Sequence, residues 1–295
     1  MPFYTHQILI CSGKRDWTSN IQDDDHGEFV KLLRSFLRST DRSNIPATTM
    51  ITASSFGTTL TSEAKQRKHG EPTVSVYLLP KFKYIPYLSM TRTAIRSLVH
   101  EYLQEPNYHK ESTLKHTSQD FEGRSRLPPS TDVNEFFVLI CGHNTRDERC
   151  GVMGPLLQEE FTRALGRLDI PVTPEGESPT DTVNNSVNQG ERLEARNASQ
   201  AGSESVPGTT SWRARVGLVS HVGGHKYAGN VIIYIPPGYH SVMGGSHPLA
   251  GKGLWYGRVA PKHVEGIIEE TVLRGRVISE LFRGGVDDHG KMLRI

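Results

Sequence analysis

Apolar residues in the first part of the chain alternate between short continuous runs and helical spacing. Continuous apolar runs bounded by polar residues predict strands, whereas apolar residues three and four apart predict helices. Strands are expected at 6–11, 48–52 and 74–79. Two helices are expected from their apolar faces, the first made by Phe29, Leu32, Leu33 and Phe36 and the second by Ile95, Leu98, Val99, Tyr102 and Leu103. Such alternation favours an α/β fold.

The same order of elements recurs in the second half of the chain. Strands are expected at 136–141, 213–220 and 230–236. The first helix of this half should have one apolar face, made by Val152, Leu156, Phe161, Ala164, Leu165 and Leu168. The second should begin near Pro261, because proline suits the first turn of a helix. Its apolar face is made by Val264, Ile267, Ile268 and Leu273.

The two halves also resemble each other in detail. The run 8–11, followed by Arg15-Asp16, resembles the run 138–141, followed by Arg146-Asp147. Strand, helix, strand, strand, helix is the order of a minimal thioredoxin-like domain. The sequence therefore predicts an α/β fold of two thioredoxin-like lobes in tandem, the first at 1–104 and the second at 133–295.

Two polar segments interrupt this pattern. Residues 105–132 are rich in Pro, Ser, Lys and His, and we expect a linker there. Residues 171–211 contain no aromatic side chain and many Ser, Thr, Asn, Glu and Gly. A segment of that composition has too little apolar surface to order itself, so we expect a disordered insertion within the second lobe.

Composition narrows the classes of function. The net charge of +2 gives no strong field, which argues against a nucleic-acid partner. No stretch of the sequence approaches the roughly 18 apolar residues that a membrane span needs, so no membrane insertion is expected. Three cysteines do not resemble a secreted disulfide framework, and they favour a reducing compartment.

Two of the three cysteines lie close together beside a strand. Cys141 ends the run 136–141, and Cys150 follows after eight intervening residues. The pair His221 and His225 follows the apolar stretch 216–219, and Gly223-Gly224 between the histidines predicts a tight loop instead of a helix. Two thiolates and two imidazoles on facing loops make one four-ligand metal site, which is the central hypothesis.

The remaining cysteine and a further histidine receive different interpretations. The first lobe has neither a second cysteine nor a histidine pair, so Cys11 is interpreted as a structural relic of a duplicated site. His143 is near enough to Cys141 in sequence to be a ligand. A loop histidine is more often solvated, and His143 is therefore left outside the ligand set.

The donor set suits two kinds of metal site. Structural zinc accepts two Cys and two His, although its cysteines are usually only two to four residues apart. The same four donors hold a [2Fe–2S] cluster of the Rieske type, with two Cys on one iron and two His on the other. Cys141-Gly142-His143 matches the first half of the Rieske signature, but no histidine follows Cys150 at the expected place. The Rieske fold is therefore disfavoured, whereas its ligand chemistry stays open.

The combination of Cys141, Cys150 and the 221–225 histidine loop resembles the thioredoxin-like ferredoxins of the sucrase/ferredoxin-like family. The first strand with Arg15-Asp16-Trp17 and the later Trp255-Tyr-Gly-Arg258 are also similar to that family. The resemblance implies a thioredoxin-like fold, a [2Fe–2S] cluster on Cys141, Cys150, His221 and His225, and redox work. It also implies a mitochondrial location, with a cytoplasmic one as the alternative because no presequence precedes the first strand.

Three alternative functions are compatible with these donor residues. The first is an electron carrier that exchanges electrons with redox partner proteins that the sequence does not identify. The second is a structural zinc protein, and the third is a metal-free thiol–disulfide oxidoreductase that uses Cys141 and Cys150. No catalytic base, nucleophile or phosphate-binding loop stands out, so we expect a redox carrier and not a self-contained enzyme.

Overall fold

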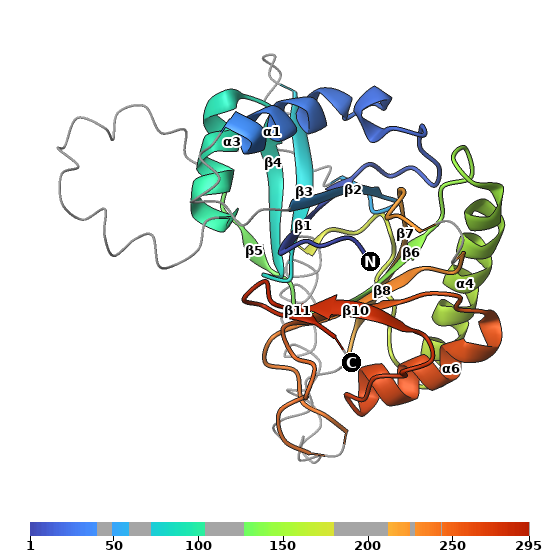
Figure 1. The fold of residues 1–295 in the computed structure, drawn as a ribbon. Coiled ribbons are helices and arrows are strands. Elements are labelled where there is room, and N and C mark those ends of the chain that lie inside the picture. Colours follow the sequence, from blue (N-terminus) through green and yellow to red (C-terminus); the bar gives the residue numbers. More distant parts are fainter. Residues whose placement is uncertain are drawn as a thin grey trace, which may run out of the picture.

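A computed structural model describes residues 1–39, 49–58, 72–103, 127–179, 212–224, 228–242 and 244–294. Its described part is a mixed α/β fold built on one large sheet (Figure 1). The strands lie in the order β11-β10-β9-β8-β6-β7-β2-β1-β3-β4-β5. The α/β class expected from the sequence is therefore confirmed.

Among the described residues, the first half of the chain contributes five strands and two α-helices. They are β1 (His6–Cys11), α1 (Gly27–Ser39), β2 (Thr49–Ser54), β3 (Thr73–Leu79), β4 (Lys83–Ser89), α3 (Arg92–Leu98) and β5 (Thr131–Asp132). A 3-10 turn at Ile21–Asp23 precedes α1, and a π-helical turn at Val99–Leu103 continues α3.

The described part of the second half contributes the remaining strands and two more α-helices. They are β6 (Phe136–Cys141), α4 (Glu148–Arg167), β7 (Ala214–Val219), β8 (Val231–Ile235), β9 (Lys252–Tyr256), α6 (Val264–Ile267), β10 (Phe282–Val286) and β11 (Met292–Leu293). A 3-10 turn at Pro261–His263 leads into α6, and a π-helical segment at Ile268–Leu273 extends it.

Strand pairing repeats between the halves. Strand β1 pairs parallel to β2 and antiparallel to β3, and β3 pairs antiparallel to β4. Strand β6 pairs parallel to β7 and antiparallel to β8, and β8 pairs antiparallel to β9. The two sets join where β2 meets β7, at the pair Ser54 and Val219. This repetition agrees with the internal duplication expected from the sequence, while two thioredoxin-like lobes stay a prediction.

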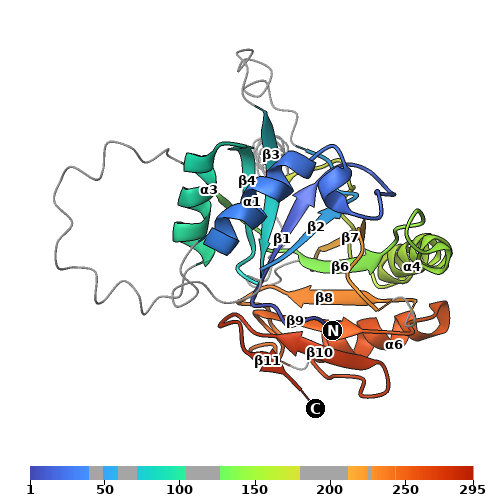
Figure 2. The same ribbon diagram turned by 45° about the horizontal axis from the view of Figure 1, so that its top comes forward.

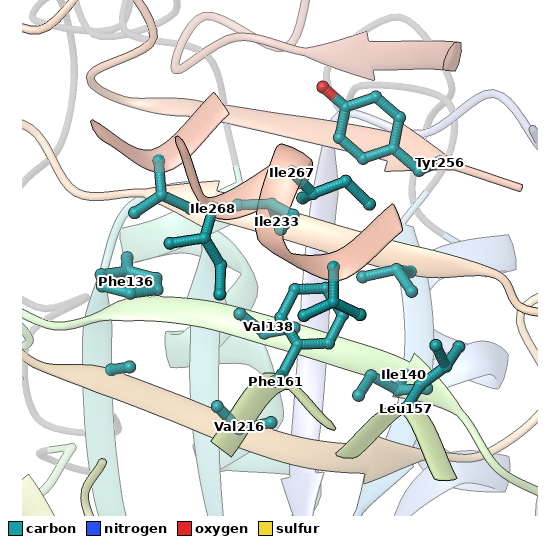
Figure 3. Close-up of a cluster of buried hydrophobic side chains, with 14 of the residues drawn as sticks. Phe136, Val138, Ile140, Leu157, Phe161, Val216, Ile233, Tyr256, Ile267 and Ile268 are labelled. Atoms are coloured by element: carbon teal, nitrogen blue, oxygen red, sulfur yellow. The ribbon is translucent and has the colours of Figure 1, made fainter. Parts of the chain in front are cut away.

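Each half has its own helix-covered core. Helices α1 and α3 lie over the strands of the first half, and α4 and α6 lie beside those of the second (Figures 1 and 2). Figure 3 shows side chains of the second core, where Phe136, Val138 and Ile140 of β6 lie near Leu157 and Phe161 of α4. None of the described helices combines the length and apolar character needed to cross a membrane.

A third core draws side chains from both halves. Phe137 of β6 makes edge or tilted ring contacts with Phe56, Tyr77 and Phe82 of the first half, at centroid distances of 6.0, 5.2 and 6.0 Å. Alternate residues of a strand face opposite sides of its sheet. The odd-numbered residues of β6, including Cys141, therefore face this shared core, and Cys11 at the end of β1 belongs to it too.

Parts of both expected polar segments belong to the described structure. Within the expected linker, Thr131 and Asp132 form β5 and pair with β4, while 104–126 lies outside the described residues. Within the expected insertion, 171–179 is ordered: Val172 bridges Ala214, and Thr173 and Ser178 are buried. Polar groups there find hydrogen-bond partners in the core, which composition alone does not reveal. Residues 180–211 lie outside the described part of the chain.

The predicted apolar face of α4 is wrong in part. Val152, Leu156 and Leu168 are 57%, 48% and 49% exposed. The other predicted residues of this face, Phe161, Ala164 and Leu165, are buried. The buried face is made by Cys150, Gly154, Leu157, Gln158, Phe161, Ala164 and Leu165. At about 100° per residue, Leu156 lies about 140° around the axis from Phe161. Helix α4 carries two apolar stripes, and Gly154 and Gln158 complete the buried one.

Candidate metal centre

The two cysteines come from adjacent ends of a strand and a helix. Cys141 is the last residue of β6, and Cys150 lies in the first turn of α4. Asp147 begins that helix as its N-cap, because its side chain accepts a hydrogen bond from the Arg149 N–H at 3.1 Å. The loop 142–147 therefore returns the chain to the strand end, and both thiols are buried and free of any disulfide.

His143 follows Cys141 in the sequence and lies close to both cysteines in space. Its Nδ1 is 3.3 Å from the Cys141 Sγ, and the ring is only 1% exposed. One ligand atom from each of Cys141, His143 and Cys150 lies within 4.8 Å of the others. The expectation that His143 is a solvated loop residue is therefore wrong, because the returning loop folds it inward.

The histidine loop after β7 meets this group. The ring of His221 lies 4.7 Å from that of His143, at an interplanar angle of 72°. The backbone N–H of Val222 donates a hydrogen bond to the Cys141 thiol. The structure thus brings Cys141, Cys150 and His221 to one place, together with His143.

The loop that carries His221 has the conformation expected from its glycines. Gly223 and Gly224 have φ angles of +98° and +74°, in the left-handed region that residues with a Cβ rarely adopt. A helix through His221 is therefore excluded, as predicted. His225, the fourth predicted ligand, lies outside the described residues.

The two thiols influence each other's protonation. A hydrogen bond between the sulfurs and burial raise the pKa of Cys141 well above its usual value. The same hydrogen bond lowers the pKa of Cys150, because it stabilises the Cys150 thiolate. One proton is thus shared by the pair. Loss of that last proton leaves two negative sulfurs side by side, an arrangement that a bound metal cation stabilises.

Glycines allow the helix to approach the ligand loop closely. A Cβ built on Gly154 would lie 2.7 Å from the Gly142 Cα and 3.0 Å from the Cys141 carbonyl oxygen. A Cβ on Gly151 would lie 2.2 Å from the Asn144 Oδ1. All three distances are below ordinary van der Waals contact, so the start of α4 packs against the loop only because these side chains are absent.

Cys11 lies apart from this group. It ends β1 as Cys141 ends β6, and it is fully buried in the core shared by the two halves. Burial raises the pKa of its thiol, which keeps it protonated. Its position agrees with the interpretation as a relic of the duplicated strand end.

Comparison with known proteins supports the resemblance inferred from the motifs. The chain is similar to proteins named "Altered inheritance of mitochondria protein 32" from three yeasts. The identity is 31% for Meyerozyma guilliermondii, 35% for Clavispora lusitaniae and 33% for Debaryomyces hansenii. The matches cover 57%, 55% and 52% of this chain and 43%, 39% and 37% of those relatives. The aligned region thus spans less than half the length of each relative.

No solved structure matches the chain. The family model described as "Sucrase/ferredoxin-like" matches residues 1–284, which include both halves of the sheet and the Cys–His group. The chain therefore belongs to the sucrase/ferredoxin-like family.

Proposed function

We propose that this protein is an electron carrier that holds a [2Fe–2S] cluster through Cys141, Cys150, His221 and His225. The observation that supports the proposal is the convergence of two buried thiols, from the end of β6 and the start of α4, with the His221 ring from the loop after β7. The name of the family, ferredoxin-like, agrees with electron transfer.

The donor set fits such a cluster chemically. Cysteine thiolates bind iron–sulfur clusters, and two histidines replace two cysteines in Rieske-type centres. When bound, the cluster would accept and release single electrons. The Val222 N–H, which points at the Cys141 sulfur, would donate a hydrogen bond to a ligand, an interaction known to tune reduction potentials.

His143 has a different role in this proposal. Its Nδ1 contacts the Cys141 sulfur, so we assign it as a hydrogen-bond donor to that ligand and not as a ligand itself. A matched set of variants tests the assignment. His143→Asn should retain the cluster with a shifted potential, whereas His221→Ala and His225→Ala should weaken or change it. Loss of the cluster in His143→Asn with retention in His225→Ala would reverse the two roles.

Structural zinc is the second candidate, and one observation favours it. The ligand atoms of Cys141, His143 and Cys150 lie within 4.8 Å of one another, which suits a single ion with a fourth donor from the His221 loop. A metal-free thiol–disulfide function of Cys141 and Cys150 is the third. Their spacing differs from the Cys-x-x-Cys arrangement of thioredoxin-like redox motifs.

Purification under anaerobic conditions distinguishes these functions. A [2Fe–2S] protein should contain iron and acid-labile sulfide and should lose visible absorption when it is reduced. A zinc protein would be colourless and would retain zinc, and a thiol oxidoreductase would be free of metal and would form a disulfide. Either of the last two results would contradict the proposal.

The proposal extends to organisation and place in the cell. The first half, 1–104, would be a degenerate thioredoxin-like lobe, 105–132 would connect it to the second, and 133–295 would carry the cluster. Because the similar yeast proteins are named for the inheritance of mitochondria, we propose work in mitochondrial redox homeostasis. Fractionation of cells that express a tagged native chain tests the location, and recovery in the cytosol alone would contradict it.

A further inference from the structure

A carboxylate from the first half of the chain binds the loop that carries the metal ligands. Asp16 lies 129 residues before Thr145, yet its two oxygens accept hydrogen bonds from the Thr145 N–H at 3.1 and 3.2 Å. The Thr145 hydroxyl donates to the same carboxylate at 2.8 Å, and the Asn144 N–H donates as well. Residues 144 and 145 lie between Cys141 and Cys150.

The orientation of Asp16 is itself fixed. The Trp17 N–H donates to the Asp16 Oδ1 at 2.9 Å, and the Trp17 side chain is buried in the core next to α4. Burial alone would raise the pKa of Asp16, but the hydrogen bonds from Thr145, Trp17 and Asn144 outweigh it and lower that pKa. The carboxylate thus stays ionised and can accept several hydrogen bonds at neutral pH.

The middle part of the ligand loop 142–147 is exposed, and although Asn144 packs closely against Gly151 of α4, burial contributes little to holding it. Asn144, Thr145 and Arg146 are exposed, in contrast to the buried residues 141–143 before them and Cys150 after them. A second link joins the same stretches in the opposite direction, since the Arg146 guanidinium donates to the Ser19 carbonyl oxygen. Hydrogen bonds to the first half therefore fix the conformation of the loop.

The repeated Arg-Asp pair of the sequence has two different uses here. In the second half, Asp147 caps helix α4, and Arg146 reaches Ser19. In the first half, Asp16 reaches across to the loop 144–145, and Arg15 pairs with Glu175 at 2.9 Å. The first half thus contributes both residues of its pair to contacts with the second half, and the second half contributes Arg146 to a contact with the first.

We propose that Asp16 is a positioning residue of the metal centre: it holds residues 144 and 145 so that Cys141 and Cys150 face one another. The proposal depends on one part of the proposed function, namely that Cys141 and Cys150 bind a metal, whatever that metal is. It follows that the first half of the chain, which lacks the ligand set, is needed for the full metal affinity of the second.

Binding of Co²⁺ to the full-length apoprotein tests this inference, because Co²⁺ binds cysteine thiolates with a characteristic absorption whatever the native metal is. Asp16→Asn keeps the size of the side chain but removes the charge and one acceptor. We expect about tenfold weaker Co²⁺ binding, or about 1.4 kcal/mol. We also expect faster amide hydrogen exchange in the peptide 142–147.

Two further variants separate positioning from general stability. Arg15→Gln removes another contact between the halves, to Glu175 and Gln158, but does not touch the loop. It should lower the melting temperature and leave Co²⁺ affinity within about twofold of wild type, the scatter of independent sites. Thr145→Val removes one donor to Asp16, and combining it with Asp16→Asn should weaken binding by less than the sum of the two changes.

Failure of the inference about Asp16 can be distinguished from failure of the proposed electron-carrier function. Co²⁺ affinity of Asp16→Asn within about twofold of wild type would overturn the inference, as would an equal loss in Arg15→Gln. A wild-type chain that binds no Co²⁺ would overturn it too. A wild-type chain that binds Co²⁺ but never acquires iron and sulfide would contradict the electron carrier while the role of Asp16 stands.

Discussion

The close approach of helix α4 to the ligand loop makes Gly154 a sensitive position. In Gly154→Ala the added Cβ would lie 2.7 Å from the Gly142 Cα and 3.0 Å from the Cys141 carbonyl oxygen. Both neighbours are backbone atoms, which cannot rotate away as the end of a side chain can. The helix and the loop must therefore separate, and the separation displaces the residues beside Cys141.

The expected cost follows from two opposing effects. Overpacking costs about 1–3 kcal/mol, and contact with backbone places this substitution at the upper end of that range. Alanine favours the helix over glycine by about 1 kcal/mol. We expect a net loss of about 2 kcal/mol in the free energy of unfolding. Because the loop shifts, Co²⁺ binding to the apoprotein should weaken as well.

Gly166 provides a matched control on the same helix. A Cβ there meets no atom within 4 Å, so Gly166→Ala should stabilise the protein by up to about 1 kcal/mol and leave metal binding unchanged. Pro155 follows Gly154, and a Cβ before proline is itself disfavoured in a helix. The double variant Gly154→Ala/Pro155→Ala removes that second effect and should still bind Co²⁺ weakly.

Denaturant unfolding and Co²⁺ titration of these variants are the assays. Equal stability and equal metal affinity of Gly154→Ala and Gly166→Ala would show that a Cβ at position 154 does not displace the ligand loop. Recovery of full affinity in the double variant would show that proline strain, and not contact with the ligand loop, causes the loss.

Three further predictions concern the ligands, a buried ion pair and pH. Cys141→Ser should abolish metal binding, whereas Cys11→Ser should retain it; equal metal content in the two purified variants would contradict the ligand assignment. Glu135→Gln should lower the free energy of unfolding by about 3–5 kcal/mol, because it leaves the fully buried guanidinium of Arg215 without its carboxylate. Denaturant unfolding measures this loss, and a loss below about 1 kcal/mol would show that the ion pair contributes little. Burial lowers the pKa of His6 from 6.5 to about 4, so the unfolded chain binds this proton first and stability should fall as pH drops from 6.5 to 4. His6→Asn should flatten that part of the pH profile, and an unchanged slope would contradict the assignment.

Strong local patterns in the sequence predicted the strand and the loop that carry the candidate ligands. The run 136–141 is apolar at nearly every position because β6 is buried on both faces, one against α4 and one against the shared core. The sequence therefore predicted the end of this strand at Cys141. The adjacent glycines 223 and 224 likewise indicated a loop, and their φ angles confirm it.

Strands β4, β9 and β10 were not predicted, since each contains a residue that weakens the signal of a strand. Pro86 lies within β4, Gly253 within β9, and Gly284-Gly285 within β10. Their neighbours in the sheet supply what the local sequence lacks. A Cβ on Gly253, for example, would lie 2.3 Å from the ring of Tyr234 on the adjacent strand.

The surroundings of the ligands could not be predicted because they depend on contacts between distant residues. Burial of His143 follows from the return of the loop, which no local pattern encodes. Asp16 reaches the loop from 129 residues away, and its only signal in the sequence was the repeated Arg-Asp pair. Sequence patterns identify elements and donors, whereas the residues that hold the donors in place become visible only in the fold.

Electron paramagnetic resonance of the reduced, anaerobically purified protein, with histidine nitrogen labelled with ¹⁵N, shows both whether a [2Fe–2S] cluster is present and whether histidine binds it. We expect the signal of a reduced [2Fe–2S] cluster with strong coupling to histidine nitrogen, and weaker coupling in His221→Ala. A protein without such a signal, or one whose cluster shows no strongly coupled histidine nitrogen, would contradict the proposed function.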